Sequence, residues 1–279
     1  MKKITRRSFL AAAGLTAAAL ALTACGGSSS STASSTASSA AASSEAASSS
    51  AAAELTTVEA GKLTMATNAA FPPYEMTTDT GAFEGIDADT AQAIAEKLGL
   101  ELQIDDMDFD AALLSVQQGK ADIVMAGVTV TDERKAVMDF SDSYATGIQS
   151  IIVPEGSDIA TPDDLAGKKI GTQRGTTGYI YCSDDFGDEN VVAYDDGLTA
   201  VQALNNGRVD AVVIDNAPAK EFVAANPGLV ILDTSYAEED YAIGMAKGSA
   251  LEDAINATLE ELKADGTLQS IVDKYITAE

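Results

Sequence analysis

Two residues of opposite charge stand where they could hold one small molecule by its two ends. Arg134 lies in the segment TDER, and Asp215 ends the apolar run VDAVVID. A guanidinium can donate two parallel N–H bonds to a carboxylate, and a carboxylate can accept hydrogen bonds from an ammonium group. Taken alone, an Arg or an Asp is more often solvated surface, so the pattern defines a candidate binding pair only.

The segment RGTTG (174–178) could contribute an anion site. It lies between a predicted strand and a predicted helix, so the hydroxyls of Thr176 and Thr177 and the free N–H groups there would lie at a helix N-terminus. The helix dipole and the unpaired N–H groups favour negative charge at that end. An ordinary helix cap is the alternative interpretation.

The segment AGVT (126–129) has a similar setting, because it also follows a predicted strand. The backbone of Gly127 and the hydroxyl of Thr129 could reach a carboxylate that Arg134 holds. This places a second possible anion contact in the first half of the chain.

Strand-length apolar runs alternate with helical patterns through the body of the chain, which predicts an α/β fold with parallel sheets. LLSVQQGKADIVMAG (113–127) and VQALNNGRVDAVVID (201–215) share one layout: an amphipathic helix, a Gly, a cation, and an Asp before a buried strand. The match suggests one unit in each of two lobes, although any α/β protein repeats helix, Gly and strand. Two closing helices, 250–264 and 268–276, need a face to cover.

The composition excludes several classes of function. The formal net charge is −26, so nucleic acid and anionic membrane surfaces are unfavourable partners. The chain contains no His, which removes His-based catalytic triads and the commonest zinc sites, and no metal or cofactor is expected. Cys182 is predicted to be a small buried hydrophobe, with a reactive thiol as the alternative.

The first residues are typical of an export signal. A basic stretch precedes an apolar run from Phe9 to Ala24, which is shorter than the about 20 residues that span a bilayer as a helix. Residues 1–24 are therefore predicted to be a cleaved signal peptide. The segment TRRSFL resembles a twin-arginine signal, so both that route and the general secretory route stay open.

The residues that follow indicate a lipid anchor on a tether. Leu22 to Cys25 resemble the lipobox of bacterial lipoproteins, in which the Cys is lipidated, and this would make Cys25 the only attachment to a membrane. From Gly26 to Ala53 every residue except Glu45 is Gly, Ser, Thr or Ala. Such a segment cannot bury enough apolar surface to offset its ordering entropy, so residues 25–57 are predicted to be a disordered tether.

Four longer motifs occur in one order along the body: TNAAFPPYEM (67–76), GAFEGIDADTAQAIAEKLGL (81–100), DFDAALLSVQQGKADIVMAGVTVTDERKAVMDFSDSY (108–144) and KIGTQRGTTG (169–178). They resemble the polar amino-acid binding proteins of ABC importers, solute-binding protein family 3. The resemblance covers about residues 60–276.

The resemblance implies a site for a free amino acid. Arg134 would bind the α-carboxylate and Asp215 the α-ammonium, because each group loses hydration when enclosed and needs a charge-assisted partner. The expected ligand-binding residues are Asn68, Phe71, Tyr74, Phe109, Ala126, Gly127, Thr129, Arg134, Gln173, Thr176, Thr177 and Asp215.

The part of the expected site that would hold the ligand side chain combines apolar and polar residues. Phe71, Tyr74 and Phe109 are candidate walls, with the core as their alternative place, and Asn68 and Gln173 are candidate polar contacts. Several relatives have Asp where this chain has Asn68. That difference favours a neutral polar ligand over a strictly cationic one, while glutamine, glutamate, cystine and basic amino acids all stay conceivable.

The resemblance also implies the architecture, a type II periplasmic-binding-protein-like fold of two α/β lobes. Lobe 1 would comprise 58–143 plus 245–279, and lobe 2 would comprise 149–239. Two hinge strands, 144–148 and 240–244, would join them. A ligand that bridges the lobes would stabilise their closed arrangement.

The expected function is capture of a free polar L-amino acid outside the cytoplasm and delivery to an ABC permease, by a monomer that is not an enzyme. One alternative is a dehydratase of the same fold that acts on arogenate or prephenate, but no carboxylate pair stands out by spacing as its general acid and base. A receptor sensor domain is another, although no signalling segment follows Glu279. Adhesin or structural roles leave the paired charges unexplained.

The lipobox generates a first testable prediction. Replacing Cys25 with Ser removes the thiol that would carry the lipid, so the variant should be released from membranes into the soluble fraction. Fractionation of cells expressing both forms measures this. A Cys25→Ser protein that stays membrane-bound and normally processed would contradict the anchor.

Overall fold

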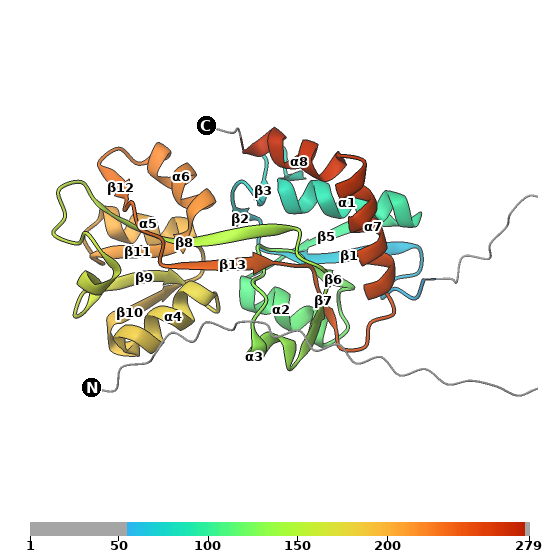
Figure 1. Cartoon of the computed structure of the whole chain (residues 1–279), viewed down its shortest axis with the longest axis horizontal. Coiled ribbons are helices and arrows are strands. Elements are labelled where there is room, and N and C mark those ends of the chain that lie inside the picture. Colours follow the sequence, from blue (N-terminus) through green and yellow to red (C-terminus); the bar gives the residue numbers. More distant parts are fainter. Residues whose placement is uncertain (1–54, 277–279) are drawn as a thin grey trace, which may run out of the picture. The chain divides into compact units, whose positions relative to one another are not determined.

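The structure is a computed structural model, and it describes residues 55–276. The predicted signal peptide, Cys25 and most of the predicted tether lie outside these residues. The described chain is an α/β protein with two lobes, each built on an open sheet (Figure 1). Its first half contains β1 (Lys62–Thr67), β2 (Ala70–Phe71), β3 (Glu75–Thr77), β4 (Phe83–Glu84), α1 (Ile86–Leu98), β5 (Glu101–Asp106), α2 (Phe109–Gln117), β6 (Ile123–Val124), α3 (Asp132–Lys135) and β7 (Met138–Phe140).

The remaining elements follow β8, a long strand of 10 residues (Ala145–Pro154). They are the 3-10 helix η1 (Pro162–Leu165), β9 (Ile170–Gln173), α4 (Thr177–Phe186), η2 (Asp188–Asn190), β10 (Val191–Tyr194), α5 (Gly197–Asn205), β11 (Ala211–Asp215), α6 (Asn216–Ala225), β12 (Leu229–Ile231), β13 (Ala237–Tyr241), β14 (Gly244–Ala246), α7 (Glu252–Ala264) and α8 (Thr267–Tyr275).

The first sheet has the strand order β5-β1-β6-β14-β7. Strands β5, β1 and β6 are parallel, whereas β14 comes from the end of the chain and runs antiparallel to β6 and β7. The last two helices therefore return to this sheet, where α1, α7 and α8 pack on one another (Figure 1). The closing helices thus find their face in the first lobe.

The second sheet has the order β10-β9-β11-β8-β12, with β13 paired to β8. Here β10, β9 and β11 are parallel, and β8 is antiparallel to β11, β12 and β13. Helices α4 and α5 pack on β9 and β11.

Both sheets use one local device, which the repeated sequence layout suggested. Helices α2 and α5 each end at a glycine in the left-handed region, Gly119 and Gly207, both with φ 65°. The Asp that follows accepts a hydrogen bond from a backbone N–H of the neighbouring parallel strand or of the residue just before it: Asp122 accepts from Thr64 N in β1 at 2.8 Å, and Asp210 accepts from Lys169 N just before β9 at 2.7 Å. The layout is therefore a structural repeat, with each Asp joining the helix-to-strand turn to the sheet.

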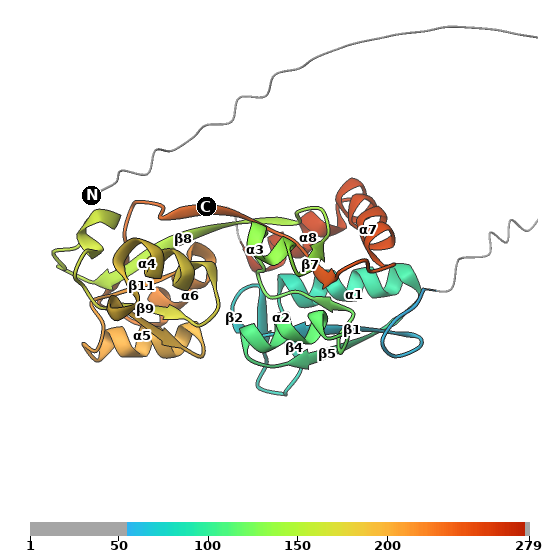
Figure 2. The same ribbon diagram turned by 90° about the horizontal axis from the view of Figure 1, so that it is seen from below.

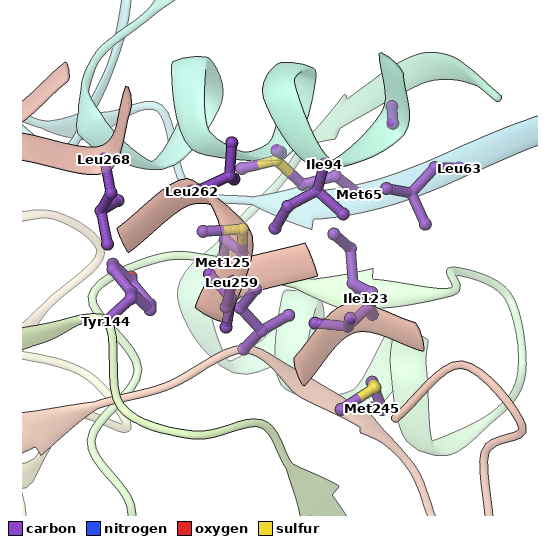
Figure 3. Packing of buried hydrophobic residues seen from close by; sticks show 14 of the residues in the cluster. Leu63, Met65, Ile94, Ile123, Met125, Tyr144, Met245, Leu259, Leu262 and Leu268 are labelled. Carbon is purple, nitrogen blue, oxygen red and sulfur yellow. The ribbon is translucent and has the colours of Figure 1, made fainter. Parts of the chain in front are cut away.

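The first lobe is held by a core between its sheet and the helices of both chain ends. Figure 3 shows Leu63 and Met65 of β1 beside Ile94 of α1 and Leu259 and Leu262 of α7. All are buried, so residues nearly 200 positions apart in sequence exclude water together. Among residues 55–276, no helix combines the length and the apolar character needed to cross a bilayer.

The chain passes between the two sheets on an antiparallel pair of strands, β8 and β13, which lie side by side in Figures 1 and 2. The pairing runs from Ala237 opposite Gln149 to Tyr241 opposite Ala145. Gly147 lies inside this pair, and a Cβ built on it would be 2.3 Å from Cζ of Tyr241. The absence of a side chain at Gly147 is what allows the Tyr241 ring to lie across β8.

This close approach predicts that Gly147→Ala is destabilising, since the added methyl must displace a buried ring. We expect the free energy of unfolding to fall by about 1–3 kcal/mol, as for other overpacked sites. Chemical denaturation followed by circular dichroism measures it. Thr146→Ala, at an exposed neighbour on the same strand, is the matched control and should change little. Equal stability of the two variants would show that Tyr241 has room to move.

Candidate functional site

A cavity lies at the carboxyl ends of parallel strands from both sheets, where β1 and β6 of one sheet and β9 and β11 of the other end. This is the usual ligand position in open α/β sheets. The cavity contains about 440 Å³ of space without protein atoms, part of it open to solvent. All the predicted site residues except Tyr74 line it: Asn68, Phe71, Phe109, Ala126, Gly127, Thr129, Arg134, Gln173, Thr176, Thr177 and Asp215.

Arg134 presents a buried guanidinium to this cavity. Its Nη1 donates to the backbone oxygen of Thr129 at 2.8 Å, and its Nη2 donates to that of Gly175 at 3.2 Å. The guanidinium carbon lies 5.3 Å from the centre of the Phe109 ring. Burial lowers the pKa of Arg134, and no carboxylate of the described chain lies within ion-pair distance. The site therefore contains a desolvated cation that a carboxylate could pair.

Asp215 combines a structural role with its place in the cavity. Its Oδ1 accepts from Ala217 N at 2.9 Å and caps helix α6, and its Oδ2 accepts from Ile148 N of β8 at 2.8 Å. Burial raises the pKa of Asp215 to about 6, and hydrogen bonds from these two N–H groups and from Tyr241 act in the opposite direction. These three hydrogen bonds use three of the about four acceptor positions of the carboxylate, which leaves one for an ammonium group.

Thr129 differs from its predicted arrangement. Its hydroxyl donates to Oε2 of Glu239 at 3.1 Å and lies 3.4 Å from the hydroxyl oxygen of Thr177. Since a hydroxyl has one proton, Thr129 has no donor left for a carboxylate in this arrangement. The sequence could not indicate this, because Glu239 is 110 residues away.

Thr176 is the N-cap of α4, which was the alternative interpretation of its segment. Its Oγ1 accepts from Tyr179 N at 3.3 Å and donates to the backbone oxygen of Gln173 at 2.8 Å. Both hydrogen bonds of this hydroxyl are therefore made to the backbone around the start of α4. The N–H groups of Thr177 and Gly178 in the first turn have no partner within the helix and are available to an anion.

Asn68 and Gln173 meet across the cavity. Gln173 Nε2 donates to Asn68 Oδ1 at 2.8 Å and to the backbone oxygen of Asp195 at 3.2 Å. Asn68 Nδ2 donates to the backbone oxygen of Met107 at 2.9 Å. Because both N–H bonds of the Gln173 amide are used, its Oε1 is the atom that can accept from a ligand.

The aromatic residues divide between the wall and the core. Phe71 lines the cavity and stacks on Tyr74 with ring centres 5.8 Å apart, and Tyr74 makes an edge contact at 5.4 Å with Tyr241. Tyr74 itself lies in the core of the first lobe, which was its alternative place. Gly127 has φ 54°, and a Cβ there would lie 2.9 Å from the Phe71 ring, so these rings require a glycine beside them.

Five lining residues were not predicted: Glu75, Gln149, Val213, Ile214 and Tyr241. Val213 and Ile214 adjoin Asp215 in an apolar run, and Gln149 and Tyr241 come from the paired strands β8 and β13. Glu75 follows directly on Tyr74, so an acid beside an expected wall residue was a signal that could have been used.

Glu75 is the most unusual of these residues, because it is only 2% exposed and receives no hydrogen bond from a donor group of the described chain. Its carboxyl contacts that of Asp87, which is fully buried. Burial, followed by the charge of Asp87, raises the pKa of Glu75 well above its ordinary value. Burial also raises the pKa of Asp87 to about 6, although Gly127 N and the Tyr144 hydroxyl donate to it.

Most of the ionisable side chains in and beside the cavity are acidic. Arg134 is the cationic residue in its lining, whereas Glu75 and Asp215 are acidic and Glu239 lies next to Thr129. A bound zwitterion would leave this excess of acidic groups unchanged. A ligand that carries a second positive charge would place a cationic donor beside these acidic groups, so the site is chemically suited to a carboxylate, an ammonium and a further cation.

Comparison with known proteins places the chain in a family. The model of the bacterial extracellular solute-binding proteins, family 3, matches residues 63–278. The L-cystine-binding protein TcyJ of Escherichia coli K12 is 33% identical, over 79% of this chain and 85% of that protein. The arginine-, lysine-, histidine-binding protein ArtJ of Geobacillus stearothermophilus is 34% identical, with a TM-score of 0.75 over 78% of this chain and 96% of that one. An ancestral arginine-binding protein bound to arginine is 43% identical, with a TM-score of 0.74 over 77% and 98%. The chain belongs to the bacterial extracellular solute-binding proteins, family 3.

Proposed function

We propose that this protein binds a free basic L-amino acid in the cavity and delivers it to an ABC importer. The observation that carries the proposal is Glu75, a buried carboxyl in the cavity wall that no donor of the described protein contacts. Buried polar groups are normally hydrogen-bonded, so an acceptor left open in a cavity indicates a donor on the ligand. A guanidinium or an ammonium side chain supplies such a donor.

The two ends of the site have separate roles in this proposal. Arg134 and the N–H groups at the start of α4 bind the α-carboxylate, and Asp215 binds the α-ammonium. Glu75 and Oε1 of Gln173 receive the side-chain donors, and Phe71 covers the aliphatic part. Burial of Arg134, Asp215 and Glu75 supports these roles, because charge-assisted contacts are stronger where water is excluded.

The proposed ligand differs from the neutral polar amino acid that Asn68 favoured. A position occupied by Asn removes one acidic contact, but Glu75 provides another at the same cavity. The names of ArtJ and of the ancestral arginine-binding protein support a basic ligand, whereas the name of TcyJ indicates cystine. The acidic excess of this cavity supports the first of these two classes.

The other parts of the proposal concern how the protein works in its setting. We infer that it acts as a monomer outside the cytoplasm, is anchored through lipidated Cys25, and passes its ligand to a membrane permease. Strands β8 and β13 form the hinge on which the lobes close around the ligand. Binding without turnover is favoured over the dehydratase, because the named relatives are binding proteins.

The charged ends of the site give a direct prediction. Asp215→Asn keeps one oxygen, which can still cap α6, and removes the charge, although it loses the acceptor for Ile148 N; it therefore disturbs the structural role less than an Ala substitution would. Arg134→Lys keeps the charge but removes the two-pronged donor. Each should weaken binding by at least about 2 kcal/mol, roughly thirtyfold, because a buried charge of the ligand is left poorly paired.

Isothermal titration calorimetry measures the affinity of both variant proteins for L-arginine. Lys135→Ala, an exposed cation beside Arg134, is the control and should bind normally. Wild-type affinity in either Asp215→Asn or Arg134→Lys would remove that residue from the site.

The choice of ligand class gives a second prediction. In a thermal-shift panel of the amino acids, arginine or lysine should stabilise the protein most, since a ligand at 100 times its Kd adds about 2.7 kcal/mol. Glu75→Gln should reduce the shift with basic ligands far more than any shift with glutamine. A panel in which glutamine or cystine gives the largest shift, unaffected by Glu75→Gln, would contradict the basic ligand.

A further inference from the structure

Two carboxyl groups are in contact behind the cavity surface. Glu75 lies on β3 and lines the cavity, and Asp87 lies in the first turn of α1 without exposure to solvent. Their carboxyl groups lie in contact, close enough for a hydrogen bond if one of the two acids carries a proton. A hydrogen bond between two acids requires a proton, because two carboxylates are both acceptors.

The hydrogen-bond partners indicate which acid carries this proton. Asp87 Oδ1 accepts the hydroxyl of Tyr144 at 2.7 Å, and Asp87 Oδ2 accepts Gly127 N at 3.0 Å, so both oxygens of Asp87 have donors that stabilise a carboxylate. Glu75 has no such donor on either oxygen. The neutral acid is therefore Glu75, which donates its proton to Asp87.

The surroundings of Glu75 oppose its ionisation from every side. The charges that act on it most strongly come from Asp87 of α1, Asp106 at the end of β5 and Asp215 at the end of β11, and all three are acidic. The phenols of Tyr74 and Tyr144 also lie near it, and burial raises the pKa of both. Burial and these acidic neighbours raise the pKa of Glu75 well above its ordinary value, which favours its protonated form in the empty cavity.

We propose that a cationic ligand side chain displaces the proton shared by Glu75 and Asp87, so that binding of a basic amino acid is a proton-for-cation exchange at Glu75. The proposal rests on the basic ligand proposed above. The O–H bond of Glu75 breaks and the proton passes to solvent. The guanidinium or ammonium of the ligand then donates hydrogen bonds to the Glu75 carboxylate. A ligand with a neutral side chain brings no charge to the pair and leaves the proton in place.

The exchange determines how affinity depends on pH. Below the pKa that the pair has without ligand, each bound cation releases about one proton, so the affinity for arginine should rise about tenfold per pH unit. Above that pKa the proton is already absent and the dependence ends. The affinity for a neutral ligand lacks this dependence at Glu75, so rising pH increases the preference for a basic over a neutral amino acid.

Calorimetry in several buffers tests the exchange. Titrating the purified protein with L-arginine at one pH, in buffers of different ionisation enthalpy, gives the number of protons released from the slope of observed enthalpy against buffer enthalpy. We expect about one proton for the wild type at any pH below the pKa that the pair has without ligand, so the titration is repeated at decreasing pH. Glu75→Gln, an uncharged isostere of the protonated residue, should still bind with lower affinity and release none. Glu84→Gln on the adjacent strand β4 is the matched control and should release as many protons as the wild type.

The outcomes separate this proposal from the proposed function. Arginine binding with an enthalpy independent of buffer would overturn the exchange while leaving the basic ligand intact. Proton release that persists in Glu75→Gln would overturn it as well, because the proton would come from another group. A protein that binds neither arginine nor lysine, but binds a neutral amino acid, would overturn the basic ligand and the exchange together. Release confined to proteins that retain Glu75 supports the proposal.

Discussion

The structure depends on one buried charge that no carboxylate of the described chain pairs at ion-pair distance, the guanidinium of Arg134. Its only hydrogen-bond acceptors in the described protein, apart from a capping contact at its backbone, are two carbonyl oxygens, those of Thr129 and Gly175. An enclosed cation without a carboxylate costs folding energy, and that cost is recovered when a ligand brings one. Because Thr129 belongs to the first lobe and Gly175 to the second, the same cation also joins the two lobes. The buried guanidinium of Arg134 therefore contributes both to the proposed binding of a ligand carboxylate and to the contact between the two lobes.

Strand order explains why these groups can converge at all. In each sheet the carboxyl ends of parallel strands meet at one edge, and the turns that follow β1, β6, β9 and β11 supply the lining. The left-handed glycines and the acceptors Asp122 and Asp210 fix two of the helix-to-strand turns rigidly. These turns lie at the amino ends of β6 and β11, opposite the edge that carries the site, so they fix the strands whose far ends supply the lining. Arg134 comes from the first lobe and Asp215 from the second, so the two charged residues of the proposed site meet only where the lobes face each other.

Much of this could be predicted from the sequence, and the failures have physical causes. The α/β periodicity and the repeated helix, Gly and Asp layout predicted the two sheets, because those signals are local. Arg134 and Asp215 could be proposed as a charged pair because a cation in the segment TDER and an acid at the end of an apolar run are both visible locally. The acceptor of the Thr129 hydroxyl could not be predicted, since Glu239 reaches it only through the pairing of β13 with β8. Glu75 was missed because an acid in a short strand is typical of surface, and only the fold shows that it is buried.

Glu75 and Asp87 also show how a strongly acidic cavity can fold before any ligand is present. Two buried carboxylates in contact would repel each other, and the nearby Asp215 would add to that repulsion. A proton on Glu75 removes the repulsion and satisfies one oxygen of each acid at once. The protein can thus keep, inside a dry wall, an acceptor strong enough for a cationic side chain without carrying its full charge in the empty state. An amide at position 75 would also avoid the repulsion with Asp87. It would, however, be a weaker acceptor for a cationic side chain than a carboxylate, which is the physical reason for an acid at this position.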